Sequence, residues 1–265
     1  MALKVTILGS GGSMGVPGVG LGWGECDPTH PRNRRTRPSI LIESKKARIL
    51  VDTSPDLREQ LTKHDIERLD AVLMTHAHAD HLHGIDDLRG INRSMASALN
   101  IYADQTTFDA IKKKFGYVFD PIHVPQNSQP FYYKPVLIPN IIEPNTTFRV
   151  GDLDIQVMEQ SHGHTKTLGY RFGSFAYSTD VKELSEYAFQ ILEGVSVWVI
   201  GSPVIHPNHP SHIDINGALK WIKRIAPRRA FISHLGLDID YETVQNTLPE
   251  YVNLAYDGLV IHIES

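Results

Sequence analysis

A short apolar run that ends directly in four metal-binding side chains constrains this chain more than any other feature. Residues 70–74 are predicted to form a buried strand, and the segment Thr75-His76-Ala77-His78-Ala79-Asp80-His81 follows at once. If the backbone stays extended through His76 and His78, alternation places both imidazoles on one side, where they can share an ion. Asp80 and His81 then lie at the start of a predicted helix and face a second point nearby. The motif therefore predicts two adjacent ions at the carboxyl edge of a sheet.

The same residue types return at the ends of three later apolar runs, as His162, Asp180 and His234. Alone, a buried His is more often a hydrogen-bonded core residue than a ligand, and it is the recurrence that favours ligation. Five imidazoles and two carboxylates suffice for two ions with open positions for water and substrate. The predicted ligands are His76, His78, Asp80, His81, His162, Asp180 and His234, and the Asp180 carboxylate can bridge both ions.

Strand-like and helix-like segments are interspersed along all 265 residues, of which 41% are hydrophobic. The pattern predicts strands at 3–8, 39–43, 47–52, 70–74, 153–158, 195–200, 229–232 and 259–263. It predicts helices at 55–63, 106–115, 182–193, 215–225 and 241–248. No repeat or linker divides the chain, so we expect one α/β domain, residues 1–265, with mixed sheets covered by helices.

The charge balance and the single cysteine limit the partners and the compartment. There are 26 Lys and Arg against 30 Asp and Glu without long runs of one sign, so no extended nucleic-acid or membrane face is predicted and small substrates are favoured. Only Cys26 is present, which excludes an internal disulfide. The first residues lack a signal-peptide pattern and no apolar run approaches the roughly 20 residues of a membrane span. We expect a cytoplasmic protein.

The His-x-His-x-Asp-His signature, with His162, Asp180 and His234 spaced behind it, resembles the metallo-β-lactamase superfamily over the whole chain. A narrower resemblance is to the phosphoribosyl 1,2-cyclic phosphate phosphodiesterases of phosphonate breakdown. That second match rests on several short segments: Leu8-Gly9-Ser10-Gly11-Gly12, Gly15-Val16-Pro17, Arg34-Arg35, Leu88-Arg89, Thr167-Leu168-Gly169-Tyr170, His212-Ile213-Asp214-Ile215-Asn216 and Asp257-Gly258.

The resemblance implies an αββα metallo-β-lactamase sandwich, in which two mixed β-sheets are flanked by helices. It also implies a division of the ligands: His76, His78 and His162 on one ion, Asp80, His81 and His234 on the other, and Asp180 between them. Asp52 matches an acid that orients a metal-bound imidazole in the family. From the sequence alone, a helix N-cap before Pro55 explains Asp52 equally well.

Phosphodiester hydrolysis by attack of a metal-bound hydroxide is the expected chemistry, with Asp80 and His212 as catalytic residues. His212 resembles the family position for a phosphate contact or general acid, whereas His206 and His209 are interpreted as loop residues beside Pro207 and Pro210. Most arginines of segment 32–37 are interpreted as solvated. Arg34, Arg35 and Arg89 match family positions, and Arg89 is a candidate phosphate contact.

Two segments leave structural alternatives open. Residues 9–24 are glycine-rich without a Gly-x-Gly-x-x-Gly register, which favours a flexible rim of the site over a dinucleotide loop. The family resemblance would place a structural zinc there, but Cys26, His30 and Leu237 are a poor donor set, so we expect none. The segment 116–144 is either a lid, pocket wall or dimer arm, which would allow a homodimer, or an irregular excursion packed on the core.

The leading hypothesis is a metal-dependent phosphoric diester hydrolase acting on a small cyclic phosphate or nucleotide-like ester. Two divalent ions are expected, Zn²⁺ or Mn²⁺ with Fe²⁺ also compatible. The alternatives are a tRNA 3′-processing-like nuclease and a non-catalytic nucleotide-binding member of the fold. A lactamase, a thioesterase and an iron-dependent oxidoreductase are disfavoured by the intact ligand set and the segment 167–170.

Overall fold

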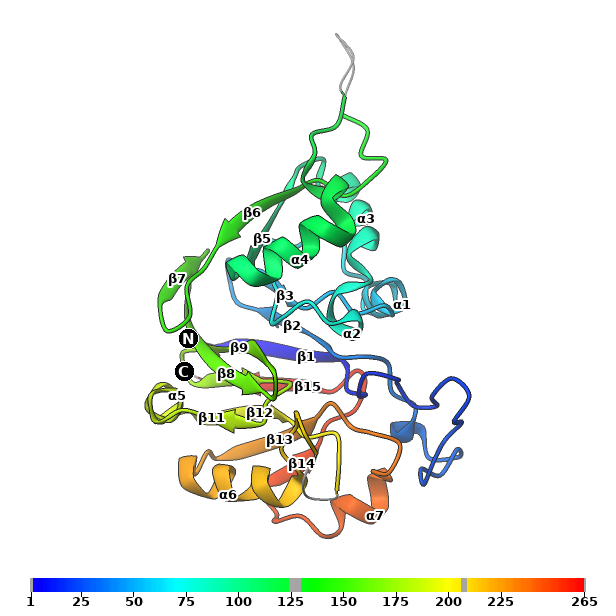
Figure 1. The fold of residues 1–265 in the computed structure, drawn as a ribbon, viewed down its shortest axis with the longest axis vertical. Helices are drawn as coiled ribbons and strands as arrows, with labels where there is room; N and C mark the ends of the chain where they lie inside the picture. The colour runs from blue at the N-terminus through cyan, green and yellow to red at the C-terminus, as the bar shows by residue number, and fades with distance from the viewer. Residues whose placement is uncertain (1, 124–129, 206–208, 265) are drawn as a thin grey trace.

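The computed structural model describes residues 2–123, 130–205 and 209–264. Within these residues, two mixed β-sheets pack face to face and helices cover the outer face of each (Figure 1). The predicted αββα metallo-β-lactamase sandwich is therefore confirmed. None of the described helices has the length and apolar character that crossing a membrane requires.

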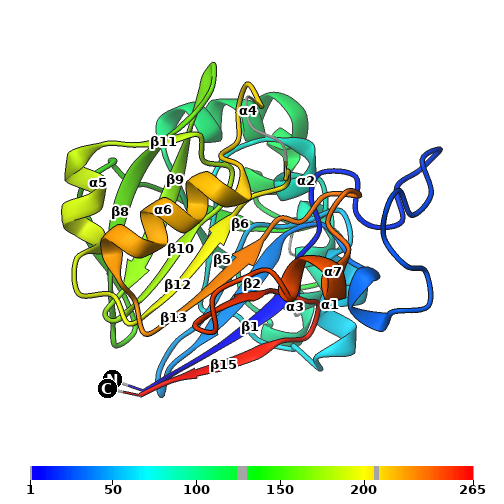
Figure 2. The same cartoon turned by 90° about the horizontal axis from the view of Figure 1, so that it is seen from below.

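The first sheet has seven strands in the described residues. Their spatial order is β15 (Val260–Ile263), β1 (Leu3–Gly9), β2 (Ser39–Glu43), β3 (Arg48–Val51), β4 (Ala71–Leu73), β5 (Leu99–Ala103) and β6 (Leu137–Ile141). The run from β3 to β6 is parallel and the remaining pairs are antiparallel. Because β1 pairs with β15, the two ends of the chain lie side by side (Figures 1 and 2).

The second sheet has eight strands in the described residues. Their order is β11 (Glu183–Leu184), β8 (Leu153–His162), β9 (Thr165–Phe172), β10 (Phe175–Ser178), β12 (Val197–Gly201), β13 (Arg229–Ser233) and β14 (Val252–Leu254), and β7 (Thr147–Val150) also pairs with β8. The strands β10, β12, β13 and β14 run parallel, and antiparallel β9 gives β8 the same direction as β10. Several strands therefore end at one edge.

Two groups of helices enclose the sheets (Figures 1 and 2). The first group covers the first sheet: α1 (Leu57–Lys63), α2 (Ala79–Leu82), α3 (Leu88–Met95) and α4 (Gln105–Phe115). The second group covers the second sheet: α5 (Glu186–Leu192), α6 (Ile215–Ile225) and α7 (Tyr241–Gln245). Short 3₁₀ turns occur at Pro31–Asn33, Ile85–Asp87 and Gly116–Phe119.

The alternation of apolar residues explains the layers. In β2, Ile40 and Ile42 point into the core between the sheets, while Leu41 points into the core beneath α1 to α4. A strand with apolar residues on both faces must be covered on both sides. Polar side chains fix the helix starts, as when Asp214 accepts a hydrogen bond from the Gly217 amide at 2.6 Å at the start of α6.

Two predicted segments differ from the structure. The helix predicted for 182–193 begins only at Glu186, because residues 183–184 pair with β8 as strand β11 and Ser185 caps the helix. The segment 116–144 is not irregular throughout, since it contains a 3₁₀ turn and edge strand β6, although its residues 124–129 lie outside the described part. Its end, at Glu143 and Pro144, forms part of the wall of a cavity beside His76 and His78.

Candidate metal centre

All seven predicted ligands lie at the edge where the strands of both sheets end. His76 and His78 follow β4, Asp80 and His81 are on α2, and His162 ends β8. Asp180 and His234 follow the parallel strands β10 and β13. Strands that run in the same direction bring residues that are distant in sequence to the same edge of a sheet. The two sheets thus contribute facing halves of one centre.

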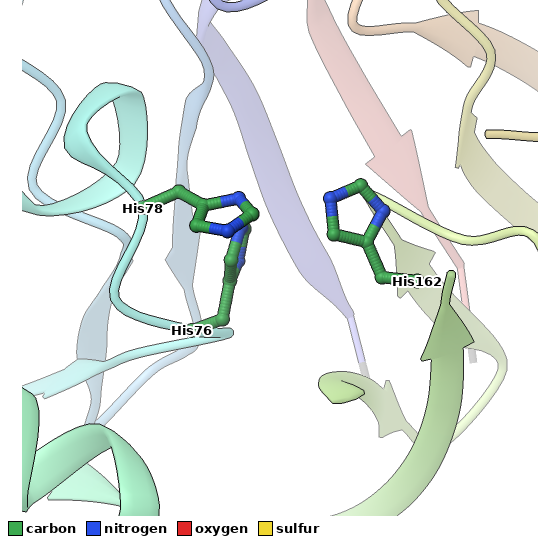
Figure 3. Close-up of side chains that lie close together, drawn as sticks. All are labelled: His76, His78 and His162. Atoms are coloured by element: carbon green, nitrogen blue, oxygen red, sulfur yellow. The ribbon is translucent and has the colours of Figure 1, made fainter. Parts of the chain in front are cut away.

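The first group of ligand atoms comes from His76, His78 and His162, which all lie within 4.8 Å of one another. Figure 3 shows the rings of His76 and His78 on one loop, with His162 facing them from the end of β8. The rings of His76 and His78 are 4.4 Å apart between centroids, as expected for two imidazoles on one side of an extended segment. Three converging imidazoles can hold one divalent ion.

The second group consists of Asp80, His81, Asp180 and His234, whose ligand atoms also lie within 4.8 Å of one another. The Asp80 Oδ2 atom is 3.3 Å from His81 Nε2 and 3.4 Å from His234 Nε2. All four side chains are buried. Two carboxylates and two imidazoles form a second donor set suited to a divalent ion.

Asp180 connects the two groups. Its Oδ2 atom lies 2.9 Å from His81 Nε2 and 3.3 Å from His234 Nε2, whereas its Oδ1 atom lies 3.6 Å from His162 Nε2. The residue has a positive φ of 49°, and Thr179 Oγ1 donates to its Oδ2 at 2.7 Å. One carboxylate with an oxygen toward each group has the geometry of a bridging ligand.

Hydrogen bonds at Nδ1 leave the Nε2 atoms of three imidazoles available. His162 Nδ1 donates to the Ser211 carbonyl at 2.8 Å, and His81 Nδ1 donates to Asp52 Oδ2 at 2.7 Å. Thr75 Oγ1 donates to Asp52 and can accept from His76 Nδ1 at 3.0 Å. A proton on Nδ1 leaves a lone pair on Nε2, which is the form that binds metals.

Asp52 organises this arrangement from the end of β3. It is fully buried with a φ of 63°, and its two oxygens accept from the Thr75 amide, the Thr75 hydroxyl and His81 Nδ1 at 2.7 to 2.8 Å. The N-cap of α1 is Asp56. The carboxylate of Asp52 therefore faces His81 and the loop that carries His76.

The ionisation of these groups suits cation binding. Burial disfavours charge on Asp80 and Asp180, but the imidazoles of His81 and His234 outweigh it and hold the pKa of both carboxyls below the ordinary range. Burial holds the pKa of His76 well below its usual value, so its ring is neutral at pH 7. The ionised carboxylates and the neutral His76 ring can accept a cation directly. Despite burial, the same carboxylates raise the pKa of His81 and His234, so these two rings must release a proton when an ion binds.

An unpaired buried nitrogen atom supports the same conclusion. The Nε2 atom of His76 is buried without a hydrogen-bond partner in the described residues. A buried polar atom without a partner is costly unless an ion or water completes it. The residues present therefore fit divalent metal ions.

His212 lies beside both groups, with Nε2 3.8 Å from Asp180 Oδ1 and its ring 4.6 Å from that of His162. Burial lowers the pKa of His212 to about 3. A neutral ring donates one hydrogen bond and accepts another. A neutral His212 can donate a hydrogen bond to a phosphoryl oxygen, but it lacks the additional proton that a general acid would supply. The neutral ring therefore fits the role of a phosphate contact better than that of a general acid.

The loop that carries His212 is fixed by contacts that the sequence did not reveal. Lys182 Nζ donates to the His209 carbonyl at 2.7 Å, and the His162–Ser211 hydrogen bond holds the same loop. The His209 ring is 4.9 Å from that of His212 and lines the same cavity, so His209 is closer to the site than its interpretation as a loop residue suggested. His206 lies outside the described residues.

Arg89 lies away from the candidate metal centre, whereas part of the glycine-rich segment lies beside it. Arg89 pairs with Asp86 at 3.6 Å and lines a cavity between α1 and α3 that contains none of the seven ligands, so no contact supports a phosphate role. Arg35 is buried, whereas Arg34 is exposed over the Trp23 ring. The residues from Gly12 to Gly15 line a cavity of about 320 Å³ with His212 and His234, which is the rim expected for this segment.

The segment around Cys26 is closed by protein contacts. The buried Cys26 Sγ donates to the Ile239 carbonyl at 3.3 Å, and His30 accepts from the Arg32 amide and stacks on Tyr241. The expectation that Cys26 and His30 bind no structural zinc stays a prediction.

Two sets of His and Asp side chains, all buried except His78, lie at the shared edge of an αββα sandwich, which is the arrangement of metal centres in metallo-β-lactamase-type proteins. Comparison with protein families agrees, because the model of the β-lactamase superfamily domain matches residues 47–235. The chain belongs to this family, as the sequence signature predicted. The fold and the His/Asp cluster together imply divalent metal ions.

Three relatives illustrate the range of the family. A protein named octanoyltransferase from Porphyromonas gingivalis is 34% identical over 97% of this chain, but the chain spans only 51% of that protein. The exodeoxyribonuclease WalJ of Streptococcus pneumoniae is 27% identical over 83% of the chain and 76% of its own length. A crystal structure described as a new diphosphatase from the PhnP family is 29% identical, with a TM-score of 0.87 over 99% of this chain and 98% of that one. This last neighbour agrees with the narrower resemblance to the phosphodiesterases of phosphonate breakdown.

Proposed function

We propose that the protein is a phosphodiesterase that uses two divalent metal ions to hydrolyse a small cyclic phosphate or nucleotide-like diester. The observation that carries the proposal is Asp180, whose two carboxylate oxygens face two separate ligand groups. A dinuclear centre is suited to phosphoryl chemistry, because charge develops on several oxygens at once. The similarity to a diphosphatase of the PhnP family supports the same class of substrate.

The residues at the candidate centre would have different roles. One ion would be held by His76, His78 and His162, and the other by Asp80, His81 and His234, while Asp180 would contact both. Ions bound there would activate water and neutralise charge on the phosphoryl group. His212 would contact a phosphoryl oxygen from the cavity that it shares with residues 12–15, and Asp52 would keep the His81 imidazole oriented. Zn²⁺ and Mn²⁺ suit this donor set, and Fe²⁺ is compatible.

Hydrolysis of bis-p-nitrophenyl phosphate and of cyclic phosphates tests the proposal. Protein loaded with Mn²⁺ or Zn²⁺ should release p-nitrophenol, and chelation should stop the reaction. The His212→Ala variant should bind metal normally but lose about 10²- to 10⁴-fold in kcat, the range for losing a group that acts on the transferring centre. An absence of turnover by protein with both metal sites filled would contradict the proposal.

A nuclease is the second candidate, because the Streptococcus pneumoniae relative is named an exodeoxyribonuclease and covers most of this chain. The net charge of −4, without long runs of basic residues, favours a small substrate over a nucleic acid. Labelled single-stranded DNA and precursor tRNA, supplied to the same metal-loaded protein, separate the two functions. A catalytically silent nucleotide-binding member would bind ligand in both assays without hydrolysing it.

A further inference from the structure

The backbone at Asp180 adopts a conformation that its residue type disfavours. Its φ of 49° lies in the left-handed region, which a residue other than glycine keeps only where the surrounding contacts impose it. The two oxygens of the Asp180 carboxylate face two separate groups of candidate ligands. The contacts that impose this backbone conformation therefore also determine whether the carboxylate can face both groups.

Gln160 reaches this backbone from β8. Its side chain is 1% exposed, and its Nε2 atom donates to the Thr179 carbonyl at 3.0 Å and to Thr167 Oγ1 at 3.1 Å. The Thr167 hydroxyl in turn donates to the Asp180 carbonyl at 3.0 Å. One amide nitrogen thus holds the peptide groups on both sides of Asp180, the first directly and the second through Thr167.

The direction of these hydrogen bonds is fixed by the donors and acceptors available. A carbonyl oxygen can only accept, so the nitrogen of the Gln160 amide, and not its oxygen, must face Thr179. The Thr167 hydroxyl gives its one proton to the Asp180 carbonyl, so Thr167 Oγ1 accepts from Gln160. The Gln160 Oε1 atom is left buried without a hydrogen-bond partner in the described residues. An unpaired buried acceptor destabilises a fold, and such costs are typical of functional sites.

Thr179 connects the fixed backbone to the carboxylate itself. Its Oγ1 atom donates to Asp180 Oδ2 at 2.7 Å, while its carbonyl accepts from Gln160. The sheet leaves no spare room beside the amide, because a Cβ atom at Gly169 would lie 2.5 Å from Gln160 Oε1. The hydrogen-bonded network of Gln160, Thr167 and Thr179 is therefore buried and continuous from β8 to the Asp180 carboxylate.

We infer that Gln160 is a positioning residue for the bridging carboxylate. Through Thr167 and Thr179 it keeps Asp180 in the backbone conformation in which the two carboxylate oxygens face two ions. The inference rests on the proposed function, since it presumes that Asp180 contacts both ions. When the amide is lost, the left-handed backbone is expected to relax, so that Asp180 binds one ion well and the other poorly.

Metal binding by variants of Thr167 and Gln160 tests the inference without relying on catalysis. Thr167→Val removes the hydroxyl at nearly constant volume, whereas Thr167→Ser keeps it. Gln160→Met keeps an unbranched side chain but removes both donors. Supporting contacts of this kind are worth about 10- to 100-fold in metal affinity, and we expect that loss for the more weakly bound Mn²⁺ in Thr167→Val and Gln160→Met. Thr167→Ser should bind Mn²⁺ nearly as the unaltered protein does in calorimetric titrations.

Electron paramagnetic resonance distinguishes loss of the bridge from a general weakening of the fold. Two Mn²⁺ ions that share a carboxylate are exchange-coupled, so the unaltered protein with both sites filled should give the spectrum of a coupled pair. At saturating Mn²⁺ the coupling should be weaker in Thr167→Val and Gln160→Met, and Thr167→Ser should keep it. Gln156→Met is the matched control, because this glutamine lies on β8 opposite Arg171, and it should change neither affinity nor coupling.

The outcomes separate the inference from the proposed function. Unchanged affinity and coupling in both Thr167→Val and Gln160→Met would overturn the positioning role and leave the dinuclear centre in place. An equal loss in Thr167→Val and Thr167→Ser would also overturn it, because packing rather than the hydroxyl would then matter. If the unaltered protein shows no coupled pair, the bridge and the inference fall together. If the coupling and the variant effects are as expected but no diester is hydrolysed, the positioning role stands and the proposed reaction falls.

Discussion

At the scale of single residues, Asp52 supports the candidate metal centre without being one of the seven predicted ligands. Its carboxylate holds His81 Nδ1 and both polar groups of Thr75 at 2.7 to 2.8 Å. Removing such a partner lets the imidazole rotate and lowers its basicity, which typically costs about 10- to 100-fold in metal affinity. We therefore predict that Asp52→Ala weakens Mn²⁺ binding by that factor.

Competition with a fluorescent chelator measures this affinity. The Asp52→Asn variant, which keeps the shape and one acceptor, should lose less than Asp52→Ala. Asp154→Asn, at an exposed position of β8, should bind Mn²⁺ as the unaltered protein does. Unchanged affinity in Asp52→Ala would show that the contact with His81 does not position a ligand.

Arg35 is expected to contribute to the free energy of unfolding rather than to the candidate metal centre. Its guanidinium is buried and donates to the carbonyls of Gly236 and Ile239 and to Asn33 Oδ1. The guanidinium thereby joins residues 33–35 to the segment that follows His234, while the Arg35 backbone pairs with Val16 of the glycine-rich segment. Loss of these hydrogen bonds leaves buried acceptors without donors, each worth about 1–3 kcal/mol.

Arg35→Met should therefore lower the free energy of unfolding by about 2–4 kcal/mol in urea titrations of the metal-free protein. The neighbouring Arg34→Met is the matched control. Arg34 is exposed over Trp23, so its loss should cost less than about 1 kcal/mol. Similar effects of both substitutions would contradict the assigned role of the buried guanidinium.

The sequence reveals the seven candidate ligands more readily than the residues that support them. His76 to His81 form a contiguous motif, and His162, Asp180 and His234 each mark the end of an apolar run. Ser211 and Lys182 carried no such signal, because their role depends on backbone contacts with a loop that only the folded chain brings near. The burial of Arg35 was hidden in the same way, since two of its partners, Gly236 and Ile239, lie about 200 positions away.

At the scale of structural elements, the turn after β8 controls the position of His212. Gly163 has a φ of 69°, and a Cβ atom built there would lie 2.9 Å from the Pro210 carbonyl. Neither backbone can retreat easily, because His162 and Lys182 already bond to the same loop. A side chain at position 163 must therefore push the loop that carries His212 away from Asp180.

We predict that Gly163→Ala lowers kcat for bis-p-nitrophenyl phosphate at least about tenfold, since small displacements of a positioned group are costly. Gly173→Ala is the control, because this glycine has a similar φ of 58° but nothing lies within 4 Å of the added Cβ. Both variants carry the same left-handed strain of about 1–2 kcal/mol. Equal activity of the two would mean that the loop position is unimportant.

Predicted and observed elements agree where both faces of a strand are buried and differ at the edges of the sheets. β2 and α6 have the predicted bounds, because their apolar patterns are complete. β6 contains Pro139 and exposed residues, which weaken the signal of an edge strand. β11 is two residues long and depends on pairing with β8, so only the tertiary structure reveals it.

At the scale of the whole molecule, the centre joins the two sheets. Its candidate ligands come from four separate parts of the chain, and their mutual approach brings charges together in a mostly buried region. Bound ions should therefore stabilise the fold as well as enable chemistry. A ligand at 100 times its dissociation constant adds about 2.7 kcal/mol to the free energy of unfolding.

We predict that metal removal with EDTA lowers the melting temperature by about 5–11 °C, because each 1 kcal/mol is worth about 2–4 °C in a chain of this size. Differential scanning calorimetry before and after re-addition of Mn²⁺ measures the change. The Asp180→Asn variant should show a much smaller shift, because the weakened bridge affects both groups. A melting temperature that does not depend on metal would argue against ions that bind across the two sheets.

The central claim is that two divalent ions share Asp180 between two sets of ligands. Anomalous diffraction from crystals grown with Mn²⁺ tests it most directly. The account predicts two peaks about 3.5–4 Å apart, one beside His76, His78 and His162 and the other beside Asp80, His81 and His234, with Asp180 in contact with both. A single peak, or peaks away from these ligands, would contradict the claim.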